Sequence, residues 1–175
     1  MAVDTERSFL SIQIALLTIS DTRTPADDAS GNLLAERITH AGHVLADRAI
    51  SRDDAETIAA HLNGWIEDRK VDAVITTGGT GLTGRDVTPE ALDLVKDKDI
   101  PGFGELFRWL SFDSIGVSTI QSRACAVVAR GTYIFALPGS KGAVCDGWDK
   151  ILVHQLDSRH RPCNFVDLMP RLREQ

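Results

Sequence analysis

The residues from 73 to 90 combine a glycine-rich turn with charged side chains, a pattern that could bind and react with a phosphate. Four glycines fall within seven residues: Gly78, Gly79, Gly81 and Gly84. They let the backbone turn sharply and approach a ligand closely. The apolar, β-branched run before them predicts a buried strand, and Thr88 followed by Pro89 predicts a helix start with Thr88 as N-cap. A strand, glycine loop and helix in this order aim backbone N–H groups at an anion.

Two known phosphate-binding patterns match this stretch only in part. Gly79 and Gly84 have the spacing of a P-loop. Arg85 and Asp86 stand where its lysine and its serine or threonine belong, so we exclude a P-loop nucleoside triphosphatase. Gly79, Gly81 and Gly84 also fit the dinucleotide spacing, but helical sequence occupies the region where a second strand with its acidic residue is expected.

Asp86 gives the stretch a more specific interpretation. A carboxylate repels a phosphate unless a metal ion bridges them. Asp86 therefore predicts a magnesium-phosphate site. The alternative is a tight turn in which Asp86 is an ordinary turn residue.

Other candidate residues stand at further junctions between strands and helices. Ser20 and Asp21 end an apolar strand over 12–19, where they could act on a ligand or serve as solvated turn residues. A helix begins after the next strand at 51–54, where either Asp53 or Asp54 can be the N-cap. At 138–141, Lys141 in a first helical turn opposes the helix dipole, which suggests an anionic ligand; the alternative is a solvated lysine.

The hydrophobic pattern predicts an α/β domain with a mostly parallel sheet, because strands and helices alternate. Strands are expected at 12–19, 43–50, 72–77, 124–129 and 133–137, and helices at 30–40, 53–69, from 88, near 106–110 and at 140–152. The second strand is less apolar than the others, which is typical of a position near the sheet edge. The last two strands are expected to pair as a hairpin.

Composition limits the class of protein. The chain has 175 residues, which suits one domain, and its net charge of −6 disfavours nucleic acid or an anionic membrane as a partner. We find neither a signal peptide nor an apolar stretch long enough to span a bilayer. Three widely spaced cysteines favour free thiols in a reducing cytoplasm.

Taken together, four ordered motifs resemble the molybdopterin-binding family of molybdenum cofactor biosynthesis. They are TTGGTG at 76–81, RDVTPEA at 85–91, PGFGE at 101–105 and LPGS at 137–140. Segments 107–122 and 156–165 are similar to the MoaB branch rather than the longer MogA branch. The resemblance implies a three-layer α/β/α sandwich, a MogA-like fold, that binds molybdopterin, a pterin with a dithiolene and a terminal phosphate. It also implies that this phosphate attacks ATP, which gives adenylylated molybdopterin and pyrophosphate.

The resemblance carries roles onto particular residues. Asp53, with Asp54 as the shifted alternative, and Asp86 match the family's two important aspartates, and we expect both to hold Mg²⁺. Two departures are Gln121 in place of a leucine and the Ser140-Lys141 continuation, so a non-catalytic molybdopterin carrier or scaffold is the alternative function. The expected substrate-binding residues are Ser20, Asp21, Gly78, Gly79, Thr80, Gly81, Glu105, Ser111, Ser122, Arg123, Pro138, Gly139, Ser140 and Lys141.

Domain limits and assembly complete the expectations. We expect a flexible N-terminus at 1–10, one domain at 11–165 and a frayed tail at 166–175. The family resemblance implies a hexamer, or otherwise a trimer, and other proteins of cofactor biosynthesis as partners. Trp109, Phe112 and Ile115 fit no single core face, so we expect some of them at a subunit interface, with 157–165 as an arm across a neighbour.

Overall fold

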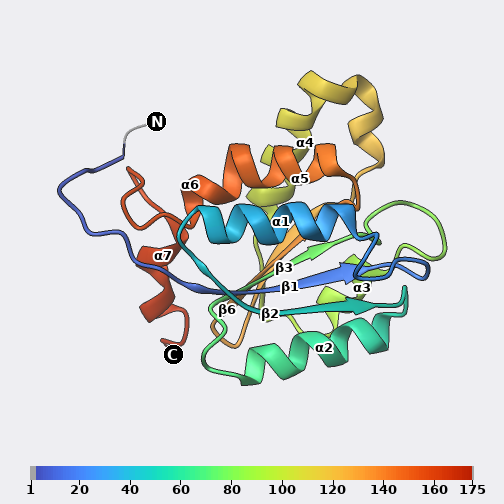
Figure 1. The fold of residues 1–175 in the computed structure, drawn as a ribbon, viewed down its shortest axis with the longest axis horizontal. Helices are drawn as coiled ribbons and strands as arrows, with labels where there is room; N and C mark the ends of the chain where they lie inside the picture. Colours follow the sequence, from blue (N-terminus) through green and yellow to red (C-terminus); the bar gives the residue numbers. More distant parts are fainter. Residues whose placement is uncertain (1–2, 175) are drawn as a thin grey trace.

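The computed structural model describes residues 3–174, which form a six-stranded sheet between two layers of helices (Figure 1). The strand order is β2-β1-β3-β6-β5-β4. The strands are β1 (Gln13–Ile19), β2 (Val44–Ser51), β3 (Ala73–Thr77), β4 (Lys98–Asp99), β5 (Cys125–Ala129) and β6 (Thr132–Leu137). The first four in spatial order run parallel, while β5 is antiparallel to both β6 and β4. The predicted α/β fold with a mostly parallel sheet is confirmed.

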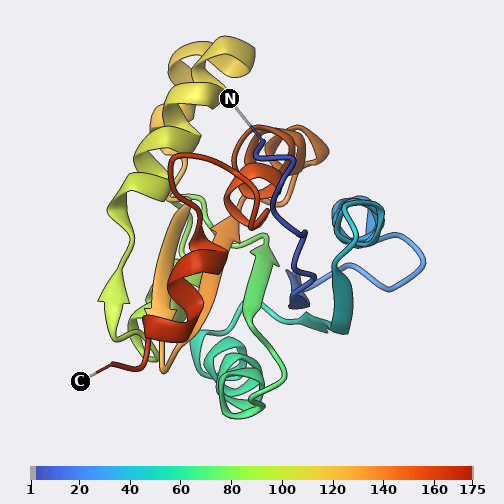
Figure 2. The ribbon, with the colours of Figure 1, turned by 90° about the vertical axis from the view of Figure 1, so that its left-hand side faces the viewer.

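The helices cover both faces of the sheet (Figures 1 and 2). They are α1 (Ala29–His40), α2 (Ala55–Glu67), α3 (Thr88–Asp93), α4 (Pro101–Ile115), α5 (Lys141–Gly147), α6 (Val153–Gln155) and α7 (Phe165–Leu168), with the 3₁₀ turns η1 (Gly116–Gln121) and η3 (Met169–Arg171) and the π-helical turn η2 (Trp148–Leu152). None of the helices between residues 3 and 174 has the length and apolar character needed to cross a membrane.

Alternation along β1 explains the three layers. Ile14 and Leu16 point into one core with α1, α4 and α5, while Ala15 and Leu17 point into a second core with α2 and α3. Successive side chains of a strand face opposite sides, so a nearly continuous apolar run is what a strand buried on both faces requires. The less apolar β2 lies at the sheet edge, as its sequence predicted.

Both end segments are more ordered than the sequence suggested. In the tail, Val166 is buried in the core, and Phe165 packs on Tyr133 with ring centroids 4.8 Å apart. The expectation of a frayed tail from residue 166 is therefore wrong as far as Arg171, where η3 ends. The apolar residues there are too few to display a helical period, so their packing could not be read from the sequence.

The N-terminal segment lies against the segment at 157–167 (Figure 2). Arg7 pairs with Asp167 at 2.8 Å, Arg161 pairs with Asp4 at 2.9 Å, and the Leu10 N–H donates to Ser158 Oγ. Residues 3–10 are thus tied to their own chain rather than free. The segment at 157–165, which we expected as an arm across a neighbour, also has these contacts with its own domain.

Candidate functional site

The glycine loop leaves the carboxyl end of β3 with two residues in the left-handed region. Gly78 has φ 114° and Gly79 has φ 65°. A Cβ added to Gly78 would lie 2.2 Å from the Ile19 carbonyl oxygen, so only glycine fits there. The Gly78 N–H donates to the Leu137 carbonyl, which joins this loop to the end of β6.

Thr88 has a different role from the one predicted. It is the first residue of α3 rather than its N-cap, and its Oγ1 donates to the Gly78 carbonyl at 2.8 Å. Its N–H donates to the Gly79 carbonyl at 2.9 Å. Both bonds fasten the start of α3 to the glycine loop, a contact that local sequence does not reveal.

Arg123 holds the other side of the loop. Its guanidinium donates to the Gly81 carbonyl at 2.7 Å and the Asp86 carbonyl at 2.5 Å, and it pairs with Glu90. The Arg123 N–H also donates to the Thr80 carbonyl. Arg123, which we expected to bind substrate, thus directs its guanidinium to the glycine loop and to Glu90.

The sequence left open whether Asp53 or Asp54 faces the site, and the structure gives the two residues different positions. Asp54 is the N-cap of α2, and its carboxylate accepts from the Thr57 N–H at 2.8 Å. Asp53 faces the loop, because a Cβ added to Gly79 would lie 3.3 Å from Asp53 Oδ1. Asp53 is therefore the carboxylate that lies against the glycine loop, and Asp54 caps α2.

The carboxylates of Asp21, Asp53 and Asp86 lie near one another beside the glycine loop, and their surroundings differ. The pKa of Asp53 is raised above its ordinary value, first because burial disfavours its charge and then because Asp21 repels it, with a further contribution from Asp86. The pKa of Asp86 is lowered, mainly by the hydrogen bond from the Thr83 hydroxyl at 2.6 Å. Arg85 pairs with Asp21 and lowers the pKa of that carboxyl.

These carboxylates fit a magnesium ion held partly by substrate. Burial and the negative charges of Asp21 and Asp86 disfavour ionisation of Asp53, and a bound cation would offset both effects. Over the same residues, no three His, Cys, Asp or Glu side chains gather as a complete metal site. Mg²⁺ is commonly bound by one or two carboxylates together with phosphate oxygens and water, which is what Asp53 and Asp86 could offer.

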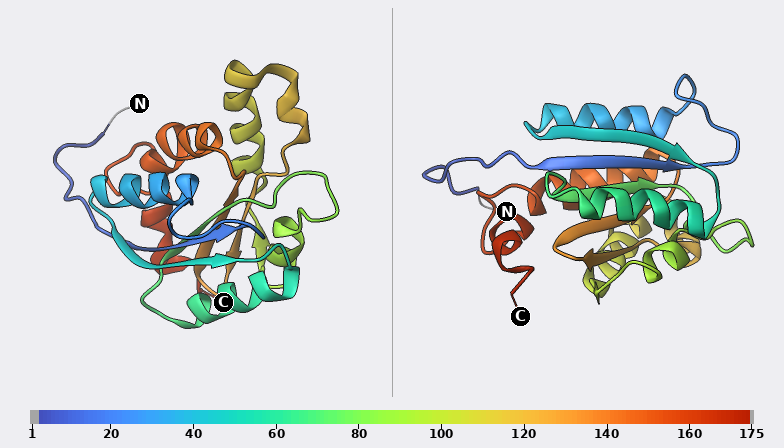
Figure 3. Two further views of the ribbon diagram at one scale, coloured as in Figure 1. Left: turned by 45° about the vertical axis from the view of Figure 1, so that its right-hand side comes forward. Right: turned by 90° about the horizontal axis from the view of Figure 1, so that it is seen from below.

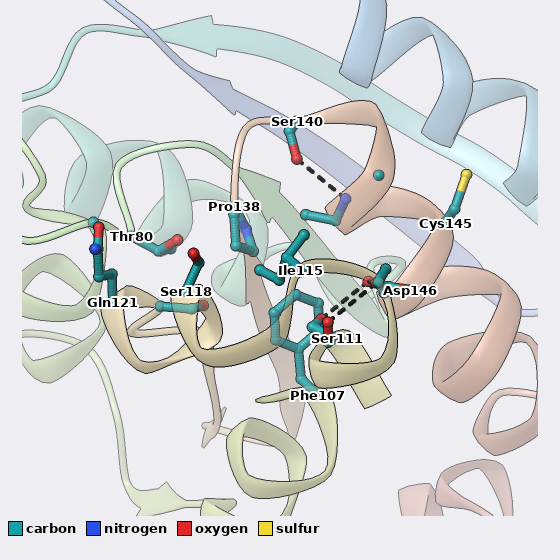
Figure 4. Close-up of a pocket in the computed structure, with 15 residues that line it drawn as sticks. Thr80, Phe107, Ser111, Ile115, Ser118, Gln121, Pro138, Ser140, Cys145 and Asp146 are labelled. Atoms are coloured by element: carbon teal, nitrogen blue, oxygen red, sulfur yellow. Dashed lines mark hydrogen bonds between the residues drawn. The ribbon is translucent and has the colours of Figure 1, made fainter. Parts of the chain in front are cut away.

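A cavity of about 500 Å³ opens on the other side of the glycine loop (Figure 4). It is lined by Thr80, Gly81, Phe107, Ser111, Ser114, Ile115, Ser118, Gln121, Ser122, Pro138, Ser140, Gly142, Ala143, Cys145 and Asp146. Residues from the loop, α4, η1 and the start of α5 thus meet around one hollow. Its volume suits a small-molecule ligand.

Six of the expected binding residues meet at this cavity, and others do not. The six are Thr80, Gly81, Ser111, Ser122, Pro138 and Ser140. Ser20 and Asp21 line a second cavity, formed by the ends of β1 and β2. Glu105 lies in a separate groove beside Arg108 and β5. Lys141 is exposed as the first residue of α5 and forms no hydrogen bond or ion pair with residues 3–174.

Asp146 is a cavity residue that sequence reasoning missed. It is 8% exposed, and its Oδ2 accepts from Ser111 Oγ and Ser114 Oγ, each at 3.0 Å (Figure 4). Its Oδ1 pairs with Lys150 at 2.6 Å. Partial signals were present, since Asp146 and Lys150 are four apart on a helix and the two serines are three apart. Nothing local indicated that α4 and α5 pack side by side.

Comparison with known proteins identifies the family. The sequence matches the family described as "Probable molybdopterin binding domain" over residues 15–158. This chain belongs to that family. Within it, "Molybdenum cofactor biosynthesis protein B" of Escherichia coli (strain K12) is 48% identical over 157 residues, which cover 90% of this chain and 92% of the relative.

Solved structures of family members agree with the fold. A crystal structure of Molybdenum cofactor biosynthesis protein B superposes with a TM-score of 0.86 at 37% identity, covering 97% of this chain and 100% of that one. The tungsten cofactor synthesizing protein MoaB from Pyrococcus furiosus gives a TM-score of 0.77 at 31% identity, covering 94% and 98%. The expected three-layer, MogA-like fold is confirmed.

Proposed function

We propose that this protein acts in molybdenum cofactor biosynthesis by binding molybdopterin and adenylylating its terminal phosphate with Mg-ATP. An oxygen of that phosphate attacks the α-phosphorus of ATP. The bond from this phosphorus to the bridging oxygen of the β-phosphate breaks, and pyrophosphate leaves. Such a transfer needs positioned phosphates and neutralised charge rather than covalent help from the protein.

The observation that carries the proposal is that one glycine loop borders both the cavity and the carboxylates. Gly81 lines the cavity, and a Cβ added to it would lie 2.7 Å from Asp86 Oδ2. Gly79 borders Asp53 in the same way. A phosphate resting on the loop would therefore face a ligand-sized hollow on one side and two carboxylates on the other.

Different groups of residues have different roles in this reaction. Backbone N–H groups of Gly79 and Thr80 in the loop orient the phosphate, and the cavity beside Ser111 and Ser122 holds the pterin. Magnesium, when bound at Asp53 and Asp86, supplies charge neutralisation for the phosphates of both substrates. Arg85 is an exposed cation paired with Asp21, and it can exchange that carboxylate for a phosphate oxygen.

A second function is favoured by the contacts of Asp86. Its Oδ2 already accepts from the Thr83 N–H and hydroxyl, at 2.9 and 2.6 Å, which is what a purely structural turn aspartate does. If Asp86 has only that role, the protein is a molybdopterin carrier or scaffold without turnover.

One incubation separates the two functions. The purified protein is mixed with molybdopterin, Mg²⁺ and ATP, and adenylylated molybdopterin and pyrophosphate are quantified over time. Adenylylation that requires Mg²⁺ supports the enzyme. Stoichiometric binding of molybdopterin without either product supports the carrier, and failure to bind molybdopterin rejects both.

A further inference from the structure

Four serines that line the cavity use their hydroxyl groups in hydrogen bonds, two as acceptors and two as donors. Ser140 Oγ accepts from the Ala143 N–H at 3.1 Å, and Ser122 Oγ accepts from the Ala124 N–H at 3.3 Å. Each of these hydroxyls keeps its hydrogen free and can donate to a ligand. Ser140 is the N-cap of α5, and Ser122 directly precedes Arg123, whose N–H donates to the Thr80 carbonyl of the glycine loop.

The hydroxyl groups of Ser111 and Ser114 act as hydrogen-bond donors instead. Each hydroxyl lies 3.0 Å from Asp146 Oδ2, and an ionised carboxylate can only accept, so the serine hydrogens point toward it. Ser114 Oγ also lies 3.1 Å from the Ser111 carbonyl, which is another acceptor. Both hydroxyls can therefore offer a ligand only their lone pairs.

A neighbouring lysine balances the charge of the Asp146 carboxylate. Lys150 pairs with Oδ1 at 2.6 Å and keeps the nearly buried carboxylate charge balanced. A carboxylate has room for about four hydrogen bonds, and three are used by the two serines and Lys150. One acceptor position of Asp146 remains, on Oδ1, and the two serine oxygens at Oδ2 can also accept.

We propose that Asp146, acting directly and through Ser111 and Ser114, makes this end of the cavity an acceptor surface that selects the N–H edge of a 2-amino-4-oxo heterocycle. This inference rests on the proposed function, since a pterin carries such an edge. Donors at the loop end face the phosphate, and acceptors at the Asp146 end face the amino group and ring N–H. Asp146 thereby determines which base is accepted and which way round it lies.

The test compares two ligands that differ at one position. The probes are 6-hydroxymethylpterin and 6-hydroxymethyllumazine, which carries a carbonyl oxygen in place of the 2-amino group. Fluorescence titration of the wild-type protein should show pterin binding about tenfold tighter, because an oxygen facing acceptors leaves hydrogen bonds unmade. In Asp146→Asn the amide can donate to the serine oxygens, so the preference should fall to nearly onefold.

Two further variants separate recognition from structure. Ser114→Ala leaves the Asp146–Lys150 pair intact and should reduce the preference about threefold, since one acceptor is lost. This variant decides the question if Asp146→Asn fails to fold. Asp149→Asn is the matched control: Asp149 lies three residues on, pairs with Arg37 and is not part of the cavity lining, so it should keep the full preference.

Two results would overturn the inference and leave the proposed function standing. One is equal affinity of the wild-type protein for the two probes, or binding of neither up to about 1 mM. The other is a folded Asp146→Asn or Ser114→Ala protein that keeps the full preference for the pterin. The proposed function fails separately, if molybdopterin itself is neither bound nor adenylylated.

Discussion

Asp86 combines a tie to the glycine loop with a position against the proposed phosphate. Asp86→Asn keeps an oxygen that can accept from Thr83, so the fold should survive with a stability change within about 1 kcal/mol. The loss of one of two magnesium carboxylates should lower the adenylylation rate at least about a hundredfold. Product formation is followed together with the thermal midpoint.

A suitable comparison for Asp86 is an aspartate on the same stretch that is remote from the loop. Asp93→Asn removes a charge at the end of α3 that, among residues 3–174, pairs only with Lys96, and it should leave the rate unchanged. Wild-type turnover by Asp86→Asn would make Asp86 a turn residue and move support to the carrier function.

The charge of Asp53 should lower the stability of the folded protein at neutral pH. Because its pKa is raised in the folded protein, the unfolded chain ionises it more readily, and the penalty on the native state grows from the ordinary aspartate value upward until the pH exceeds the raised pKa. Below the ordinary aspartate value both states are protonated and the penalty vanishes. Asp53→Asn should therefore raise the free energy of unfolding by about 0.5–1 kcal/mol at pH 7 and change it little at pH 3.5.

The measurement for Asp53 is a pair of denaturation curves at each pH. Adding Mg²⁺ at pH 7 should raise the thermal midpoint of the wild-type protein and not that of the variant, because only the former offers the carboxylate. A variant less stable than wild type at pH 7 would contradict the electrostatic account.

Among the structural elements, the glycine loop has positions that differ sharply in whether they can accept a side chain. A Cβ on Gly81 would collide with the Asp86 carboxylate, whereas one on Gly84 meets nothing within 4 Å. Gly81→Ala should weaken molybdopterin binding about tenfold or more and cost about 1 kcal/mol of stability, because the carboxylate must move. Gly84→Ala, in the same loop, should bind normally.

Fluorescence titration of molybdopterin against the two loop variants checks this expectation. Equal binding by Gly81→Ala and Gly84→Ala would place the ligand away from Gly81.

The elements that the sequence predicted well are those whose pattern is local. The apolar runs of β1, β3 and β6 and the glycine loop could be recognised because burial on both faces and tight turning each leave a mark within a few residues. Other features depend on segments meeting in space. The choice of Asp54 as cap, the contact of Thr88 with Gly78 and the position of Asp146 beside α4 all required the packed chain.

At the scale of the whole molecule, α4 and η1 project beyond the other helices (Figures 1 and 3). Both carry exposed apolar side chains. Trp109 is 74% exposed, Val117 78% and Ile120 81%. Such a concentration typically marks a subunit interface, so we propose a closed homo-oligomer, a hexamer or otherwise a trimer. Light scattering should give a multiple of the 19.1 kDa chain mass.

The interface can be tested by placing a charge on it. Ile120→Asp should lower the mass toward that of one chain, because burying an unpaired carboxylate is costly. Leu94→Asp alters an equally apolar exposed residue elsewhere, 63% exposed at the end of α3, and should leave the mass unchanged. A wild-type mass of one chain at micromolar concentration would reject the assembly.

The pairing of residues 3–10 with 157–167 also bears on how the protein is made. Arg7 and Asp167 are 160 residues apart in sequence, and Phe165 and Val166 pack against the core beneath α1 and α5. During synthesis, the early strands leave the ribosome well before these late partners exist. A nascent chain halted ahead of Phe165 would therefore hold an unfinished core, with the aromatic rings of Tyr133 and Phe135 uncovered and open to chaperones.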